Sequence, residues 1–191
     1  MKKLISLILC VILAVSCAAA LAESTPEEDN TVTINMHGAF IIKGSLFEGY
    51  KWQLSTESTS SQLVGVFVSD DMTAPVMQLS IALNDSYGEV NRLNDLTDEE
   101  LKALEATYSI DASVEISYTE TTHGTKLMVA REVGEDRDFV AFFTIYKGHM
   151  IELVLVPGQE AEDPTLTQEQ IDYCVQLLSD MEFVPAENAA E

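Results

Sequence analysis

Runs of apolar and β-branched residues recur along most of this chain, and turn-forming residues separate them. Such runs predict β-strands, because Val, Ile, Phe, Tyr and Thr fit a pleated surface while Gly, Pro, Asn and Asp interrupt it. The run FVAFFTIY is apolar on both of its alternating faces, so this strand is expected inside a sheet that is covered on both sides. The predicted strands cover residues 32–36, 50–54, 62–69, 76–83, 112–121, 125–133, 138–146 and 149–156.

Two short segments, LTDEEL and LTQEQI, carry the signature of a helix N-terminus. In each, a Thr precedes a Glu or Gln by three residues, so that the two side chains can cap the first turn reciprocally. A Leu before each cap and an apolar residue after it complete a hydrophobic staple. We therefore predict two helices that are capped by Thr97 and Thr167 and that run to about residues 108 and 181.

Together these elements predict an α+β fold. We expect a mostly antiparallel sheet of about seven strands with the two main helices packed on it, because each helix has an apolar stripe that can cover a sheet face. No linker, repeat or low-complexity tract interrupts residues 32–184, so a single domain is expected over that range. The acidic segment 23–31 and the tail 185–191 are expected to be disordered.

The segment IYKGHMI contains His149, one of three histidines in the chain. Lys147 and Gly148 separate two β runs, which predicts a tight hairpin in which Gly supplies a positive φ. His149 then begins the returning strand beside a loop tip, and a structural role is expected for it. His37 and His123 each precede a Gly and are interpreted as turn or surface residues.

The first 22 residues have the pattern of a secretory signal peptide. Two lysines precede the apolar run LISLILCVILAV, and a small-x-small cleavage signal ends at Ala22. We expect cleavage between Ala22 and Glu23 and a secreted or extracytoplasmic protein. The apolar run is shorter than the about 20 residues that span a bilayer, and no later run approaches that length, so no transmembrane span is expected in the mature protein.

The cysteines leave a lipid-anchored form as an alternative. Cys17 follows LAVS, an imperfect lipoprotein signal, and a lipid on it would tether the protein to a membrane face. The AAALA that follows Cys17 favours ordinary cleavage instead.

Cleavage after Ala22 would leave Cys174 as the single cysteine, so no internal disulfide could form and the core alone would stabilise the fold. Apolar neighbours predict that Cys174 is buried and inert.

The chain is strongly acidic, with a formal net charge of −22. Such a surface repels nucleic acid, whose binding requires clustered Lys and Arg, whereas it keeps an exported protein soluble and attracts cations. Calcium is therefore a candidate partner at 70–71, 94–100 or 134–138. The helix macrodipole, which favours acids in the first turn, explains most acids of the second segment, and a solvated turn explains GEDRD at 134–138.

The order of the elements resembles that of a known family. A GYKW strand is followed by hairpin strands, the LTDEEL helix, two strands joined by THGT, a hairpin with a YKGH turn, and a LTQEQI helix that ends in LLSDMEF. Over about residues 32–184 this order is similar to small, mostly uncharacterised exported proteins of gut Firmicutes and to the PsbP-like α/β/α sandwich. The resemblance implies a binding or assembly module. The matching motifs are helix caps and turns, so the resemblance assigns no site residue to this chain.

Few residues of the sequence suggest a catalytic or ligand-binding site. The sequence has no HExxH, paired CxxC, GxSxG or P-loop motif, and no cofactor is expected. Tyr50 and Trp52 share a strand face that could stack on sugars if exposed, although core packing also explains them. We expect a non-catalytic exported module that binds a protein or a cell-envelope component. The alternatives are a carboxylate-based hydrolase of an envelope or gut polymer, since paired acids need no motif, and a lipid-anchored form of the binding module.

Overall fold

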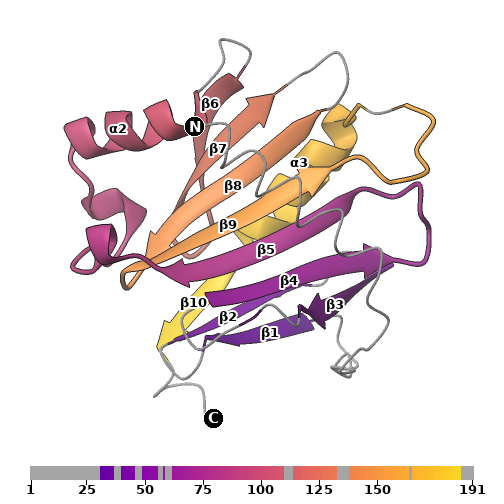
Figure 1. The fold of residues 1–191 in the computed structure, drawn as a ribbon. Coiled ribbons are helices and arrows are strands. Elements are labelled where there is room, and N and C mark those ends of the chain that lie inside the picture. Colours follow the sequence, from indigo (N-terminus) through magenta and orange to yellow (C-terminus); the bar gives the residue numbers. More distant parts are fainter. Residues whose placement is uncertain are drawn as a thin grey trace.

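The computed structural model describes residues 31–36, 40–45, 49–55, 58, 62–109, 114–132, 138–163 and 165–185. In this part of the chain, antiparallel strands form two separate sheets, and two α-helices pack beside the larger one (Figure 1). The larger sheet contains, in spatial order, β3 (Tyr50–Leu54), β4 (Gln62–Ser69), β5 (Val76–Leu83), β9 (His149–Val156), β8 (Phe139–Tyr146), β7 (Lys126–Glu132) and β6 (Val114–Glu120).

The remaining elements lie around this sheet. The smaller sheet contains, in spatial order, β1 (Thr31–Met36), β2 (Phe40–Ser45) and β10 (Glu182–Pro185). The helices are α2 (Asp98–Tyr108) and α3 (Gln168–Ser179), and the 3-10 turns η2 (Asp85–Tyr87) and η3 (Leu93–Asp95) connect β5 to α2. Among the described residues, no helix is both long enough and apolar enough to cross a membrane.

The predicted α+β class is confirmed, with a seven-stranded antiparallel sheet and two main helices. The predicted strands 50–54, 62–69, 76–83 and 149–156 coincide with β3, β4, β5 and β9, and β6, β7 and β8 fall inside the other three predictions. Both helices begin at the predicted caps, and α3 ends two residues before the predicted boundary.

The smaller sheet differs from the prediction. The segment 32–36 does form a strand, β1, but it pairs with β2 instead of joining the larger sheet. β10 pairs with the other edge of β2, so this sheet joins the beginning and the end of the domain. β2 and β10 were not among the predicted strands. Thr31 and Pro185 were expected to be disordered but are end residues of β1 and β10.

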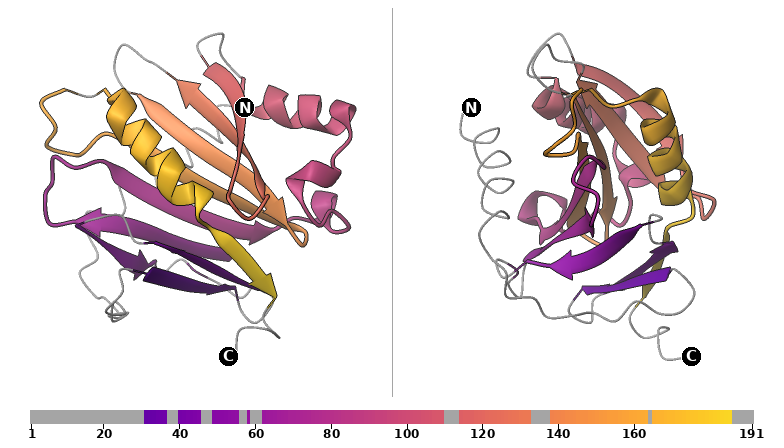
Figure 2. Two further views of the ribbon diagram at one scale, coloured as in Figure 1. Left: turned by 180° about the vertical axis from the view of Figure 1, so that it is seen from behind. Right: turned by 90° about the vertical axis from the view of Figure 1, so that its right-hand side faces the viewer.

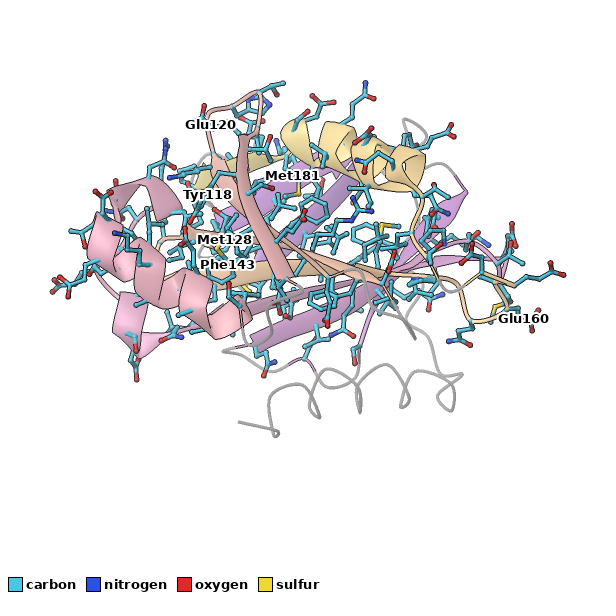
Figure 3. All side chains as sticks on the ribbon, turned by 90° about the horizontal axis from the view of Figure 1, so that it is seen from above. Tyr118, Glu120, Met128, Phe143, Glu160 and Met181 are labelled. Carbon is cyan, nitrogen blue, oxygen red and sulfur yellow. The ribbon has the colours of Figure 1, made fainter. Side chains whose placement is uncertain are left out.

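Two different layers cover the two faces of the larger sheet (Figure 2). One face, called the α3 face, packs against α3 and the smaller sheet. Its core includes Leu79, Val140, Phe142, Leu153, Ile171, Cys174, Leu178, Phe40 and Ile42. The opposite face, called the α2 face, packs against α2 and the 3-10 turns. Its core includes Met128, Phe143, Ile145, Leu93, Leu96 and Leu104. Figure 3 shows Met128 and Phe143 side by side next to α2.

The interior position of β8 in the larger sheet follows from its composition. Residues 140–146 are buried without interruption, because Phe142 belongs to the core of the α3 face and Phe143 to the core of the α2 face. Burying a Phe or Ile side chain stabilises a fold by about 1.5–3 kcal/mol, so packing a layer against each face of β8 is strongly favoured. The prediction that this strand lies inside a covered sheet is confirmed.

Reciprocal caps fix the starts of both helices. In α2, Thr97 Oγ1 accepts from the Glu100 N–H, and a Glu100 carboxylate oxygen accepts from the Thr97 N–H at 2.8 Å. Thr167 and Gln170 make the same pair of hydrogen bonds in α3. These bonds satisfy N–H groups that the first turn would otherwise leave unpaired.

Candidate functional site

Several sequence-predicted residues lie outside the described part of the chain. They are the expected cleavage residues Ala22 and Glu23, the alternative lipidation residue Cys17, and His37. The predictions of export, cleavage and lipidation therefore stay predictions.

The IYKGHMI segment is a structural hairpin. Lys147 and Gly148 both have positive φ, 48° and 75°, which matches a type I′ turn and confirms the predicted tight hairpin. His149 begins β9, its Nδ1 lies 2.9 Å from the Lys147 carbonyl oxygen, and its ring packs edge-on against Phe40. His123 is exposed in the turn between β6 and β7, as predicted. The structure thus gives both histidines structural positions.

Tyr50 and Trp52 pack against the core of the α3 face and are both half-buried. The Tyr50 hydroxyl donates to the Pro75 carbonyl oxygen at 2.5 Å, and burial raises the pKa of Tyr50 to about 12. The Trp52 ring lies over Gly65 and 4.9 Å from the ring of Phe67. This packing favours the structural explanation of the pair, and a sugar-stacking role stays a prediction without support from the geometry.

The acidic segments have local structural roles. Asp70 pairs with Lys51 at 3.1 Å, and Asp71 accepts from the backbone and the hydroxyl of Thr73. Within the described residues, no group of three or more His, Cys, Asp or Glu side chains is placed to hold a metal ion. A calcium site needs several converging oxygens, so the described acids offer it no support.

Asp138 corrects one prediction. It was expected in a solvated turn, but it is only 3% exposed, and its Oδ2 accepts from the Leu166 N–H at 3.0 Å. The bond ties β8 to the start of α3. Residues 134–137 of the same segment lie outside the described part of the chain. Cys174 is buried, which confirms that part of the prediction, and burial raises the pKa of its thiol to about 12. Its inertness stays a prediction.

A second charged residue inside the larger sheet is Glu152, which is half-buried in the middle of β9. It lies on the α2 face, paired with Ser80 of β5 on one side and with Phe143 of β8 on the other. The α2-face core clusters contain residues of β5 to β9. On the same face, Val64 and Val66 of β4 are buried as well. Glu152 therefore stands within a largely apolar face.

Tyr108, the last residue of α2, is the hydrogen-bond partner of Glu152. Its hydroxyl donates to Glu152 Oε1 at 2.8 Å. The Tyr108 ring packs 5.8 Å from the ring of Phe143, and Tyr87 of η2 belongs to the same cluster. The site thus presents one carboxylate bonded to a tyrosine of α2, and Tyr87 of η2 is an electrostatic neighbour of that tyrosine. We call these residues, Glu152, Tyr108, Tyr87 and Ser80, the Glu152 site.

The Glu152 carboxylate is only partly compensated. Among the described residues, no Lys or Arg nitrogen lies within 4.0 Å of it, and its second oxygen, Oε2, has no hydrogen-bond partner there. Burial raises the pKa of Glu152 above its ordinary value, and the bond from Tyr108 offsets this only in part. Burial, followed by the charge of Glu152, raises the pKa of Tyr108 far above its usual range, so this hydroxyl remains a donor.

Glu152 and Asp138 cannot act as a pair. Glu152 is opposite Phe143, whereas Asp138 precedes Phe143 by five residues and bonds to Leu166 on the α3 face. Five residues of an antiparallel strand span roughly 17 Å. Glycosidase carboxylates lie about 5–10 Å apart and flank the bond that they cleave. The two side chains are therefore too far apart, on opposite faces, for such chemistry.

Sequence reasoning passed over Glu152 as a site. The available signal was a charged residue inside HMIELVLV, a strand whose other positions after His149 are apolar. Tyr108 had no comparable signal, because its contact with β9 depends on how α2 packs.

Comparison with known proteins gives no assignment. No family model matches the sequence, and no curated protein matches it significantly.

Proposed function

We propose that this chain is an exported binding module without catalytic activity, and that it holds a protein or cell-envelope component at the Glu152 site. The observation that carries the proposal is the partly exposed Glu152 carboxylate, which lacks a cationic partner among the described residues. Polar groups that converge beside aromatic rings and have shifted pKa values are typical of binding sites.

The energetics favour a role for this acid beyond folding. Removing an ion from water costs several kcal/mol, whereas a hydrogen bond to a charged group returns about 1.5–3 kcal/mol. Glu152 is partly exposed and meets only part of that cost, and its raised pKa indicates that the Tyr108 bond does not offset this part in full. A ligand that donates to Glu152 would offset the remainder, and such a trade of stability for function is common at binding sites.

The neighbours of Glu152 support binding rather than catalysis. Its partners across the sheet are Ser80 and Phe143, and its hydrogen-bond donor is a tyrosine with a raised pKa. Ser80 has no histidine opposite it, because Val64 and Glu152 are its cross-strand partners. An activated serine needs a base within hydrogen-bond reach, and a hydrolytic acid pair would need a second carboxylate.

Site-specific photo-crosslinking in the producing cells tests the proposal. A benzoylphenylalanine is placed at Gln78, which lies on the α2 face beside the site, or at Gln176, which is exposed on α3. The expected result is a discrete crosslinked species from position 78 that position 176 does not give. Equal labelling from both positions, or none from position 78, would contradict the proposal.

A further inference from the structure

We propose that the Glu152 site receives an organic cation, an ammonium or guanidinium group, which a partner protein supplies as a Lys or Arg side chain. This inference rests on the proposed function and specifies the chemistry of its ligand. It follows from three properties of the site: a charge that no described cation compensates, its aromatic neighbours, and the lack of a metal-ligating group of three among the described residues.

The charge selects a cation. Glu152 has one neutral donor, Tyr108, and no Lys or Arg of the described residues pairs with it. The whole chain carries a formal net charge of −22, so its field attracts basic partners and repels anionic ones. A bound cation would compensate the carboxylate through Oε2, the oxygen that the Tyr108 hydrogen bond does not occupy.

The aromatic neighbours favour an organic cation over a metal ion. Tyr87 and Tyr108 lie in one cluster with Phe143, and tyrosine faces attract ammonium and guanidinium groups. A hard metal ion needs several oxygen ligands, and the described residues contain no metal-ligating group of three. One carboxylate beside aromatic rings is the combination that recognises a basic side chain.

A protein partner is favoured over a sugar polymer by the same observations. A sugar hydroxyl is a neutral donor and would leave the charge of Glu152 uncompensated. A Lys or Arg side chain supplies both a donor and a full positive charge, so it forms an ion pair with the carboxylate in addition to the hydrogen bond. A neutral ligand is therefore the alternative that the experiment must separate.

The test is a titration of the ¹⁵N-labelled protein, followed by NMR, with two probes of similar shape. The cationic probe is Nα-acetyl-lysine methylamide, and the neutral probe is Nα-acetyl-glutamine methylamide. We expect the lysine probe to shift the amide signals of Ser80, Tyr108 and Glu152, and Glu152→Gln to weaken its binding at least about tenfold. The matched control, Glu115→Gln, removes the same charge from an exposed position of β6 and should leave binding unchanged.

Two outcomes would overturn the inference. Equal weakening by Glu152→Gln and Glu115→Gln would show that only the overall charge attracts the probe. Equal binding of the lysine and glutamine probes would show that the site takes a neutral group. Neither outcome removes the proposed function, because a discrete crosslink from position 78 would still identify a binding site whose ligand is not a basic side chain.

Discussion

Glu152 occupies a position where the fold would accept an apolar side chain. Its neighbours along the same face of β9 are Met150 and Val154, and both contribute to the α2-face core. A carboxylate there costs stability, since no described cation compensates it. The site residue was visible in the sequence as a charge in an apolar strand, but its partner Tyr108 was not, because helix packing cannot be read from the chain.

Glu152→Gln is expected to stabilise the protein at neutral pH by about 0.5–2 kcal/mol. Gln keeps an oxygen acceptor for Tyr108 and removes the charge. Because the folded state raises the pKa of Glu152, folded protein binds this proton more tightly than unfolded protein. The Glu152 contribution to stability is therefore greatest below the unfolded pKa, about 4.3, and falls as pH rises through the folded pKa.

Urea denaturation of both proteins between pH 4 and pH 8 measures this difference. The two free energies of unfolding should approach each other at the acidic end and separate as pH rises, with the variant more stable. A wild-type protein that is more stable than the variant at pH 7 would show that the Glu152 charge is already compensated.

Gly65 and Trp52 provide a second test at the residue scale. A Cβ at Gly65 would overlap the Trp52 ring, so Gly65→Ala should displace the indole and destabilise the fold by about 1–3 kcal/mol. Trp52 is the single Trp of the chain, and its emission should shift to longer wavelength with easier quenching by iodide. Gly44→Ala is the control, since its Cβ would meet only Met181 Cγ at 3.4 Å. Unchanged emission in Gly65→Ala would mean that Trp52 does not pack over β4.

At the scale of elements, the sequence was sufficient to predict a helix or strand where residues at its own ends mark its boundaries. The caps Thr97 and Thr167 mark the helix starts, and β9 keeps its predicted bounds between a turn glycine and a proline. The four-residue β10 carries too little pattern to be recognised, and its pairing with β2 joins distant parts of the chain. β1 showed a strand pattern, but which sheet it joins depends on β2 and β10.

Removing the cap of α3 should destabilise the protein measurably. Thr167→Ala loses the hydroxyl that accepts from the Gln170 N–H at 3.2 Å, and the expected cost is about 1 kcal/mol. Thermal denaturation followed by circular dichroism compares it with Thr165→Ala, an exposed threonine two residues earlier. Equal melting temperatures for the two variants would show that the cap contributes nothing.

At the scale of the whole molecule, two covers protect the larger sheet, and the acids concentrate outside the core. The α3 layer and the smaller sheet cover one face, whereas α2 and the 3-10 turns form the cover of the other. Export would explain why a strongly acidic surface is useful, because it keeps the protein soluble and attracts basic partners.

The intact mass of the protein from its producing cells tests the predicted processing. We expect a chain that begins at Glu23, which signal cleavage after Ala22 would produce. A lipid-bearing chain that begins at Cys17 would contradict that expectation and support the tethered form of the same module.

The central claim is that Glu152 belongs to a binding site, and the most direct test compares crosslinking from position 78 with and without the Glu152 carboxylate. The account predicts that Glu152→Gln abolishes the crosslinked species in the producing cells while the folded protein remains abundant. A species of undiminished yield in the variant would contradict the account, because the partner would then bind this face without contacting Glu152.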